Sequence, residues 1–283
     1  MLKDNVLSIL ESERSRAVSG QVLADRFGVS RNAIWKAINQ LKEEGHIIIS
    51  DGNRGYRLDE TSDILSEAGI RRFLTEDMDV EIGVYDSVDS TNNVAKRRLA
   101  EGNTGSLLVV ADSQTGGRGR LGHTFYSPEH SGLYLTYSTE LAQPIYQPER
   151  ITLASAVSVV QTLQPLLREP LKLKWVNDIF YCGKKVCGIL SEGVTDLETG
   201  LIQHVTIGIG INIRPMEFPA ELSDIAGSLM LEAPTRNEIA GRLASRLYDL
   251  CQNPSSDDYL EEYLSYSRDP DQVRDALRKI REV

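Results

Sequence analysis

The stretch TGGRGRLGHTF (residues 115–125) decides between two fold classes. Its glycines at 117, 119 and 122 have the G-x-G-x-x-G spacing of a dinucleotide-binding turn, which must open a helix so that a pyrophosphate lies at the helix N-terminus. The residues that follow, HTFYSPEHSGLYLTYS (123–138), contain Pro128 and Gly132 and alternating apolar residues, which indicates a loop and a strand. No acidic residue ends a second strand about 20 residues later, as ribose recognition requires. The context therefore argues against a doubly wound, nicotinamide-binding fold.

A second interpretation fits the same stretch better. Four glycines surround Arg118 and Arg120, so the backbone is mobile and its N–H groups are unhindered. The two guanidinium groups offer charge-assisted donors that match phosphate or carboxylate oxygens. This pattern predicts a cationic loop that closes over an anionic ligand; the alternative is a solvated surface loop.

The segments around this loop predict strands and helices in mixed order. Strands are expected at 80–88, 105–114, 132–139 and 201–213, helices at 90–102 and 148–167, and a strand with a hairpin at 171–193 whose tip lies near residues 183–185. Because the order is not a regular βαβ alternation, the pattern favours an α+β fold over a doubly wound sheet.

The first 58 residues predict a separate module. A helix is expected over residues 4–12, and Ser19 can cap a second helix that ends at Gly28. Ser30 can cap a third helix, which stops at Gly45 and has an apolar inward face at residues 34, 38 and 41. Two strands then flank DGNRG (51–55), a hairpin signal. Three helices and a hairpin predict a winged helix-turn-helix.

The charge of this module suits DNA, although the whole chain has a net charge of -10. Residues 1–58 contain nine Lys and Arg against seven Asp and Glu, so the negative charge belongs to the remainder. The outward side chains suited to phosphate and base-edge contacts are Ser30, Arg31, Asn32, Trp35 and Lys36 on the third helix and Arg54 on the wing. The alternative is a small helical interaction module without a nucleic-acid role.

The remaining composition indicates an ordinary cytoplasmic protein. No apolar run reaches the roughly 18 residues that a membrane span needs, and the acidic, amphipathic N-terminus is unlike a signal peptide. Three cysteines fit a reducing compartment. Cys182 and Cys187 lack further ligands for zinc and are interpreted as small buried apolar residues.

Several strings, in order and spacing, resemble the biotin protein ligase family. They are DSTNNVAKRRLAEG (89–102), VVADSQTGGRGRLGHTFYSP (109–128), SGLYLTYS (131–138), LKWVNDIFYCGKKVCGIL (173–190) and IGIGINI (207–213). With the N-terminal module, the chain resembles the bacterial bifunctional type, which is both biotin ligase and biotin-operon repressor. Lipoate ligases have a related fold, but the GRGRLG block points to biotin.

The resemblance implies a two-step reaction with ATP and Mg²⁺. Biotin and ATP form biotinyl-5′-adenylate, which then acylates a lysine of a biotin carboxyl carrier protein. Lys185 matches the family's catalytic lysine, and Arg118 and Arg120 match the loop arginines that cover biotin and the adenylate. A closing loop is chemically needed, because the adenylate is a mixed anhydride that water destroys.

The resemblance also implies the ligand contacts. Ser90, Thr91, Asn92, Gln114 and Gly117 match the biotin pocket, together with the two arginines and the lysine. The ATP or adenylate set is Arg120, Gly122, Lys174, Asn177, Asp178 and Asn212, with Asp178 as a candidate contact to magnesium. Taken singly, most of these residues have plainer interpretations, such as a helix cap, a hairpin tip or a turn.

The expected domains are residues 1–60 (winged helix-turn-helix), 61–266 (catalytic domain) and 267–283 (a short charged, helix-like tail). The β-rich domain that usually follows in this family is expected to be missing, so transfer to the carrier should be slower than adenylation. A homodimer on operator DNA is expected. The alternative function is a DNA-binding sensor of biotin or its adenylate with weak or no transfer activity.

Overall fold

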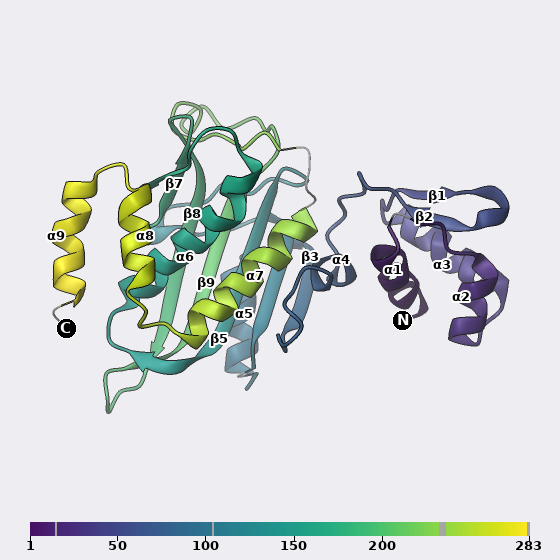
Figure 1. Cartoon of the computed structure of the whole chain (residues 1–283), viewed down its shortest axis with the longest axis horizontal. Coiled ribbons are helices and arrows are strands. Elements are labelled where there is room, and N and C mark those ends of the chain that lie inside the picture. Colours follow the sequence, from purple (N-terminus) through teal and green to yellow (C-terminus); the bar gives the residue numbers. More distant parts are fainter. Residues whose placement is uncertain (15, 104, 232–235, 282–283) are drawn as a thin grey trace. The chain divides into compact units, whose positions relative to one another are not determined.

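The computed structural model describes residues 1–14, 16–103, 105–231 and 236–281, which form two compact units (Figure 1). The first unit contains Met1–Leu74 and the beginning of helix α7 (Arg236–Gln252). It is larger than the segment 1–60 expected as a domain. The second unit contains the rest of the described chain.

The first unit is a winged helix-turn-helix, as predicted. Its elements are α1 (Leu2–Ser12), α2 (Gly20–Phe27), α3 (Arg31–Glu43), β1 (Ile48–Ser50), β2 (Tyr56–Leu58) and α4 (Glu67–Arg71). The caps are those expected: Ser19 accepts hydrogen bonds from the N–H groups of the first turn of α2, and Gly28 ends that helix at φ 63°. Apolar side chains from α1, α2 and α3, including Leu10, Leu23 and Ile38, form its core.

The segment 59–65 has a polar sequence, but two of its residues, Ser62 and Asp63, are buried. Arg236 donates from its backbone N and its Nε to the Asp63 carboxylate at 2.6 and 2.9 Å, and both residues are at least nine-tenths buried. Asn237 donates to the carbonyl of Ile64 and accepts from the backbone of Ser66. Asp63 and the carbonyl of Ile64 are therefore paired with the start of α7, whereas Glu60 and Thr61 are exposed.

The second unit is built on a seven-stranded mixed sheet, which confirms the α+β class. The strand order is β3-β4-β5-β9-β8-β7-β6, and β3 and β4 are the parallel pair. The strands are β3 (Glu81–Val88), β4 (Leu107–Gln114), β5 (Gly132–Ile145), β6 (Lys172–Lys174), β7 (Asp178–Tyr181), β8 (Lys184–Thr195) and β9 (Ile202–Asn212). The long antiparallel strands β5, β9 and β8 form its centre.

Helices cover both faces of this sheet. Helix α5 (Thr91–Ala100) joins β3 to β4 and packs against β4, β5 and β9, whereas α6 (Pro148–Leu163) packs against β8 and β9. Figure 1 shows α6 in front of the sheet and α5 behind it. The side chains of a strand point alternately to the two faces of its sheet. Every second residue of β9 therefore points to the face that α5 covers.

The chain continues through α7 into α8 (Asp258–Tyr266) and α9 (Pro270–Arg281). The tail at 267–283 was expected to be helix-like, and α9 is a helix within it; residues 282–283 lie outside the described part. In the described part of the chain no strand follows β9. None of the described helices combines the length and the apolar character that crossing a bilayer requires.

The cysteines differ in exposure. Cys187 is buried, as expected of a small apolar residue, and burial raises the pKa of its thiol. Cys251 is buried as well. Cys182 is exposed, so its interpretation as a buried residue is wrong; it occupies the turn between β7 and β8 at φ 47°. Among the residues described, no cluster of three potential metal ligands occurs.

Candidate functional site

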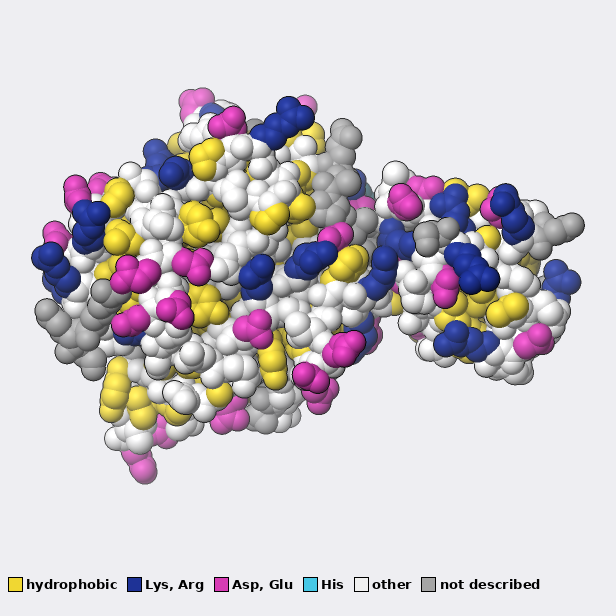
Figure 2. All heavy atoms as spheres, viewed as in Figure 1, with side chains coloured by type: hydrophobic (Ala, Val, Ile, Leu, Met, Phe, Trp, Pro, Cys, Tyr) yellow, Lys and Arg dark blue, Asp and Glu magenta, His cyan; other side chains and the backbone are white. Residues whose placement is uncertain are grey.

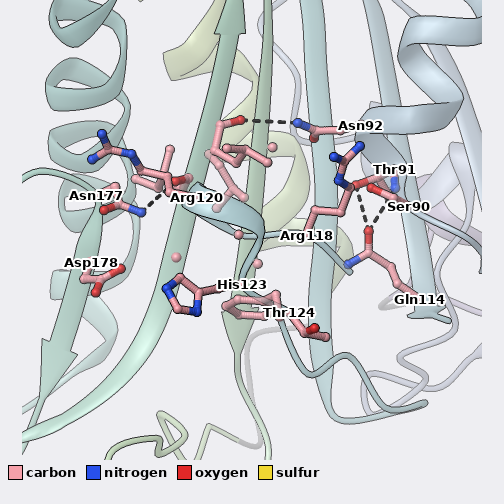
Figure 3. A pocket seen from close by; sticks show the side chains of 18 of the residues that line it. Ser90, Thr91, Asn92, Gln114, Arg118, Arg120, His123, Thr124, Asn177 and Asp178 are labelled. Atoms are coloured by element: carbon pink, nitrogen blue, oxygen red, sulfur yellow. Dashed lines mark hydrogen bonds between the residues drawn. The ribbon is translucent and has the colours of Figure 1, made fainter. Parts of the chain in front are cut away.

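A cavity of about 310 Å³ lies where β4 ends, α5 begins and β7, β8 and β9 run side by side (Figure 3). The sequence-predicted residues that line it are Ser90, Thr91, Asn92, Gln114, Arg118, Arg120, Asn177, Asp178 and Lys185. They come from five separate segments of the chain. The fold therefore brings most of the predicted contacts into one site.

Two glycines of β9 keep the cavity open. A Cβ at Gly208 would lie 2.0 Å from Asn92 Oδ1, and a Cβ at Gly210 would lie 2.5 Å from the ring of Phe125. Any larger residue at these positions would displace a neighbouring side chain. The alternation of glycine and isoleucine in 207–211 thus combines an open wall on one face with buried apolar side chains on the other.

The arginine loop (residues 115–125) is a narrow turn. It is not followed by a helix, as a dinucleotide-binding loop would be. Gly119 donates to the carbonyl of His123 at 2.7 Å, and Phe125 donates to the carbonyl of Gly117 at 2.9 Å. The inner of these two bonds encloses a single 3-10 turn (Arg120–Gly122), and Leu121 at the tip of that turn is 93% exposed. The loop has few anchors at its tip, which is the construction expected of a segment that can close.

Lys185 and Asp178 form an ion pair inside the cavity, with 2.6 Å between Nζ and Oδ1. The backbone of Lys185 is fixed on both sides, because its N–H donates to Ile225 and its carbonyl accepts from Gly227. The residue stands at the start of β8, just after the turn at Gly183. The Lys185 ammonium group is therefore held at the cavity wall by the Asp178 carboxylate.

Asn177 orients the wall next to this pair. Its side-chain Nδ2 donates to the carbonyl of Ile189 at 3.0 Å, and Ile189 N–H donates back to the Asn177 carbonyl at 3.1 Å. This reciprocal pair ties the connection between β6 and β7 to β8. The side chain therefore has a structural role in addition to facing the cavity.

Ser90, Thr91 and Gln114 form the neutral polar wall (Figure 3). Ser90 is the N-cap residue of α5 but makes no side-chain capping hydrogen bond, which argues against the plainer interpretation as a cap. Gln114 Oε1 accepts from Thr91 N–H at 2.9 Å, and its Nε2 donates to Ser127 at 3.0 Å. The amide of Gln114 is thereby fixed in one orientation.

Four predicted ligand contacts are outside the lining of the cavity: Gly117, Gly122, Lys174 and Asn212. The two glycines belong to the arginine loop, where Gly122 has φ 80°. Lys174 lies on β6 with its Nζ 5.9 Å from the centre of the Phe180 ring. Asn212 is buried at the end of β9; its Nδ2 donates to Gly227, while its Oδ1 is buried without a hydrogen-bond partner.

Several lining residues were not singled out from the sequence: His123, Thr124, Phe125, Gly188, Gly208 and Gly210. They all fall inside the quoted strings. The glycines had a signal, since glycine in a strand interior marks close approach. Phe125 had no such signal in the sequence, because its ring meets β8 and β9 only in the folded chain.

The outward face of α3 and the wing form a groove in the first unit. Arg31, Asn32 and Trp35 line it, and Trp35 is 53% exposed. The groove also contains residues that were not predicted, namely Gln21, Asn39, Lys42 and Tyr56. Figure 2 shows Lys and Arg side chains spread over the visible face of this unit.

The other three predicted DNA contacts lie elsewhere on the unit. Ser30 uses its hydroxyl to cap α3, accepting from Ala33 N–H at 3.2 Å, and Lys36 is exposed outside the groove lining. Arg54 pairs with Asp51 and lines a neighbouring hollow with Arg16 and Arg26.

Comparisons with known proteins agree with this architecture. A model of the biotin/lipoate A/B protein ligase family matches residues 84–212, and a helix-turn-helix domain model matches residues 3–57. The bifunctional ligase/repressor BirA of Bacillus subtilis (strain 168) is 35% identical over 262 residues, which cover 92% of this chain and 79% of that protein.

Two solved structures are similar to the chain. The biotin protein ligase from Aquifex aeolicus in complex with biotin and ATP is 25% identical, with a TM-score of 0.52, over 66% of this chain and 78% of that chain. The biotin protein ligase from Leishmania major in complex with biotinyl-5-AMP is 25% identical, with a TM-score of 0.53, over 66% of this chain and 81% of that chain.

The fold and the cavity together define a helix-turn-helix protein that carries a ligase-type catalytic domain. The chain belongs to the biotin/lipoate A/B protein ligase family, which confirms the resemblance seen in the sequence.

Proposed function

We propose that this chain activates biotin with ATP, transfers it to a lysine of a biotin carboxyl carrier protein, and represses transcription in response to biotin. One arrangement supports the proposal most strongly. Three cationic side chains, Arg118, Arg120 and Lys185, line the same cavity as a group of neutral polar side chains. Such a cavity suits a ligand with an anionic end and a neutral hydrogen-bonding ring.

The first step joins two anions. A biotin carboxylate oxygen attacks the α-phosphorus of ATP, a P–O bond forms, and pyrophosphate leaves with the electrons of the broken bond. Lys185 exchanges Asp178 for the carboxylate and the α-phosphate and stabilises the charge that develops between them. One preorganised donor of this kind contributes roughly 10²- to 10³-fold to the rate.

Among the described residues that line the cavity, Asp178 is the acidic one, so it is the candidate contact for Mg²⁺ bound to ATP. Magnesium is commonly bound through one or two protein carboxylates together with substrate phosphates, and the single carboxylate here fits that pattern. The ion would neutralise phosphate oxygens. When Lys185 moves to the substrates, the Asp178 carboxylate becomes available.

The arginine loop protects the intermediate. Biotinyl-5′-adenylate is a mixed anhydride, and water would hydrolyse it in an open site. Arg118 and Arg120 stand on either side of Gly119 in a loop with an exposed tip, so contact with the ligand's phosphate can close the loop. Gly117 and Gly122 give it the necessary backbone freedom.

The two ends of the adenylate have separate contacts in this proposal. Ser90, Thr91, Asn92 and Gln114 hold the ureido ring of biotin. The buried, unpaired Oδ1 of Asn212 is an acceptor suited to the amino group of adenine. Lys174 and Asn177 belong to the phosphate side; Lys174 would have to reach the site from the neighbouring strand β6.

The second step transfers the biotinyl group. The ε-amine of a carrier lysine attacks the acyl carbon, a C–N bond forms, and AMP leaves. The carrier protein must hold its lysine at the loop side of the cavity, and such positioning contributes several kcal/mol to a bimolecular step.

The N-terminal module, residues 1–60, binds operator DNA in this proposal. Arg31, Asn32 and Trp35 enter the major groove, while Ser30, Lys36 and Arg54 approach phosphates. Two copies on a two-fold symmetric operator would form a homodimer.

The test combines two readouts on the full chain. Biotin incorporation into a carrier domain is measured with ATP and Mg²⁺, and operator binding is measured with and without biotin and ATP. We expect incorporation and tighter operator binding. A chain that binds the operator in a biotin-dependent manner but does not biotinylate the carrier would support the sensor function instead.

A further inference from the structure

Carboxamide side chains line the groove that α3 and the wing form in the first unit. Among the described residues they are Gln21, Asn32 and Asn39. Gln21 is already engaged, because its Nε2 donates to Asp25 Oδ1 at 2.7 Å. The side chains of Asn32 and Asn39 have no hydrogen-bond partner within the described part of the chain. Two carboxamides of the groove are therefore available to a ligand.

Asn39 lies in the interior of α3, where helix stability gives no reason for an asparagine. Asparagine is a poorer helix former than alanine, lysine or glutamate, because its side chain competes for backbone hydrogen bonds. The caps of α3 are Ser30 and Glu44, so Asn39 does not serve as one. Its half-buried side chain lines the groove. The position therefore points to a contact outside the chain.

Asn32 and Asn39 share one face of α3, because seven residues make almost two helical turns. At a rise of about 1.5 Å per residue, they lie about 10 Å apart along the helix axis. Stacked base pairs are about 3.4 Å apart, so a helix in the major groove carries the two carboxamides across roughly three base-pair steps. Each carboxamide can therefore reach a different base pair.

The chemistry of the two carboxamides matches adenine. A carboxamide combines donors with an acceptor, and adenine presents the complementary N7 acceptor and N6 amino donor in the major groove. Guanine presents two acceptors there, so the carboxamide oxygen would face an acceptor. Trp35, 53% exposed, stands between the two asparagines on α3, where its ring can contact a thymine methyl group.

The charge of the groove suits a polyanion. Arg31 and Lys42 line it, and no acidic side chain occurs among its described lining residues. The phosphates on both sides of a major groove can therefore approach.

We infer that Asn32 and Asn39 each read an adenine in the major groove, so that an operator half-site contains two A·T pairs roughly three base pairs apart. Asn39 is thus a specificity-determining residue for the DNA, together with Asn32. The inference deepens the proposed function and rests on its claim that residues 1–60 bind operator DNA.

The test begins with selection from a library of duplexes with a randomised centre, using the full chain with biotin, ATP and Mg²⁺. The enriched sequences should contain two fixed A·T pairs roughly three base pairs apart in each half-site. Selection by Asn39→Ala should keep one of these pairs and randomise the other, and Asn32→Ala should do the reverse. Enriched sequences that keep both pairs with Asn39→Ala would overturn the inference.

The affinity for the selected duplex gives the size of the contact. Asn39→Ala should raise the Kd roughly 10- to 100-fold, the range of a bidentate contact between a side chain and a base. Gln40→Ala is the matched control, because Gln40 is the neighbouring carboxamide of α3 and is exposed outside the groove lining. It should leave the Kd and the selected sequence unchanged; a loss as large as that of Asn39→Ala would count against base reading.

A change in the DNA alone tests the contact without altering the fold of the protein. An adenine whose N7 is replaced by carbon still pairs with thymine but lacks the acceptor. Placed at the pair lost in the Asn39→Ala selection, it should weaken binding of the wild type roughly 10-fold and of Asn39→Ala hardly at all. Equal weakening of both proteins would contradict the inference.

The outcomes separate the inference from the proposed function. Wild-type protein that enriches a sequence without the two A·T pairs would sink the inference alone. Wild-type protein that enriches no sequence would sink the operator-binding part of the proposed function and the inference together. Biotin incorporation into the carrier is measured separately and does not depend on either result.

Discussion

Gly208→Ala is a small change with a large expected effect on biotin binding. The added Cβ would lie 2.0 Å from Asn92 Oδ1, so the amide must move by roughly 1 Å to reach an acceptable contact near 3 Å. That movement breaks the hydrogen bonds of Asn92 to Thr136 (2.6 Å) and Glu192 (2.9 Å). Each buried group left unsatisfied costs about 1–3 kcal/mol. We expect about 2 kcal/mol of this to appear as lost biotin binding, a roughly 30-fold rise in Kd.

The assay is calorimetric titration of biotin into the wild-type and variant proteins, with thermal unfolding to check the fold. Gly105→Ala, just before β4, is the control, because its Cβ would meet nothing closer than Asn103 Oδ1, at 3.6 Å. It should bind biotin nearly as tightly as the wild type. Wild-type affinity in Gly208→Ala, with an unchanged unfolding midpoint, would refute the claim that Asn92 shapes the biotin pocket.

Three further changes test other parts of the account. Lys185→Met should lower the rate of adenylate formation roughly 10²- to 10³-fold in single-turnover assays while biotin still binds; a normal rate would remove the lysine from the mechanism. Arg120→Gly should release adenylate into solution faster than the wild type, measured by filter retention, and equal release would mean that the loop is no lid. Trp35→Ala should weaken operator binding roughly 10-fold or more in mobility-shift titrations without altering adenylation, whereas unchanged binding would take Trp35 out of the interface.

The helix-turn-helix could be predicted from the sequence because the residues that begin and end its helices act over only a few positions. Ser19, Gly28 and Ser30 cap or end helices through contacts within a few residues, and each does so in the structure. The same holds for the loop at 115–125: the residues after Gly122 contain no helix signal, and none forms. Local chemistry alone was enough to exclude the dinucleotide-binding fold.

What escaped prediction depends on long-range contacts. The pairing of Asp63 with Arg236 could not be predicted, because the two residues are 173 positions apart in the sequence. Glu192 is separated from Asn92 by 100 residues and could be connected with the cavity only once β8 and α5 were placed. Helix α7 was missed for a different reason. Its buried residues Leu243 and Leu247 have helical spacing, so the sequence did contain a local signal for this helix.

The candidate site was predictable mainly as a set of motifs. Nine predicted residues line the cavity, but the sequence alone did not indicate the pairing of Lys185 with Asp178. It also gave no sign that Asn212 would end with a buried, unpaired oxygen. These properties depend on the register of β7, β8 and β9 and on the position of Gly227, which pattern reasoning does not give.

Adenylate formation tests the central claim most directly. The full chain is mixed with biotin, Mg²⁺ and ATP labelled at the α-phosphate, and the protein-bound product is separated and identified. The account predicts labelled biotinyl-5′-adenylate that stays bound to the protein, with none when biotin is omitted. A chain that binds biotin and ATP but yields no labelled adenylate would contradict the account.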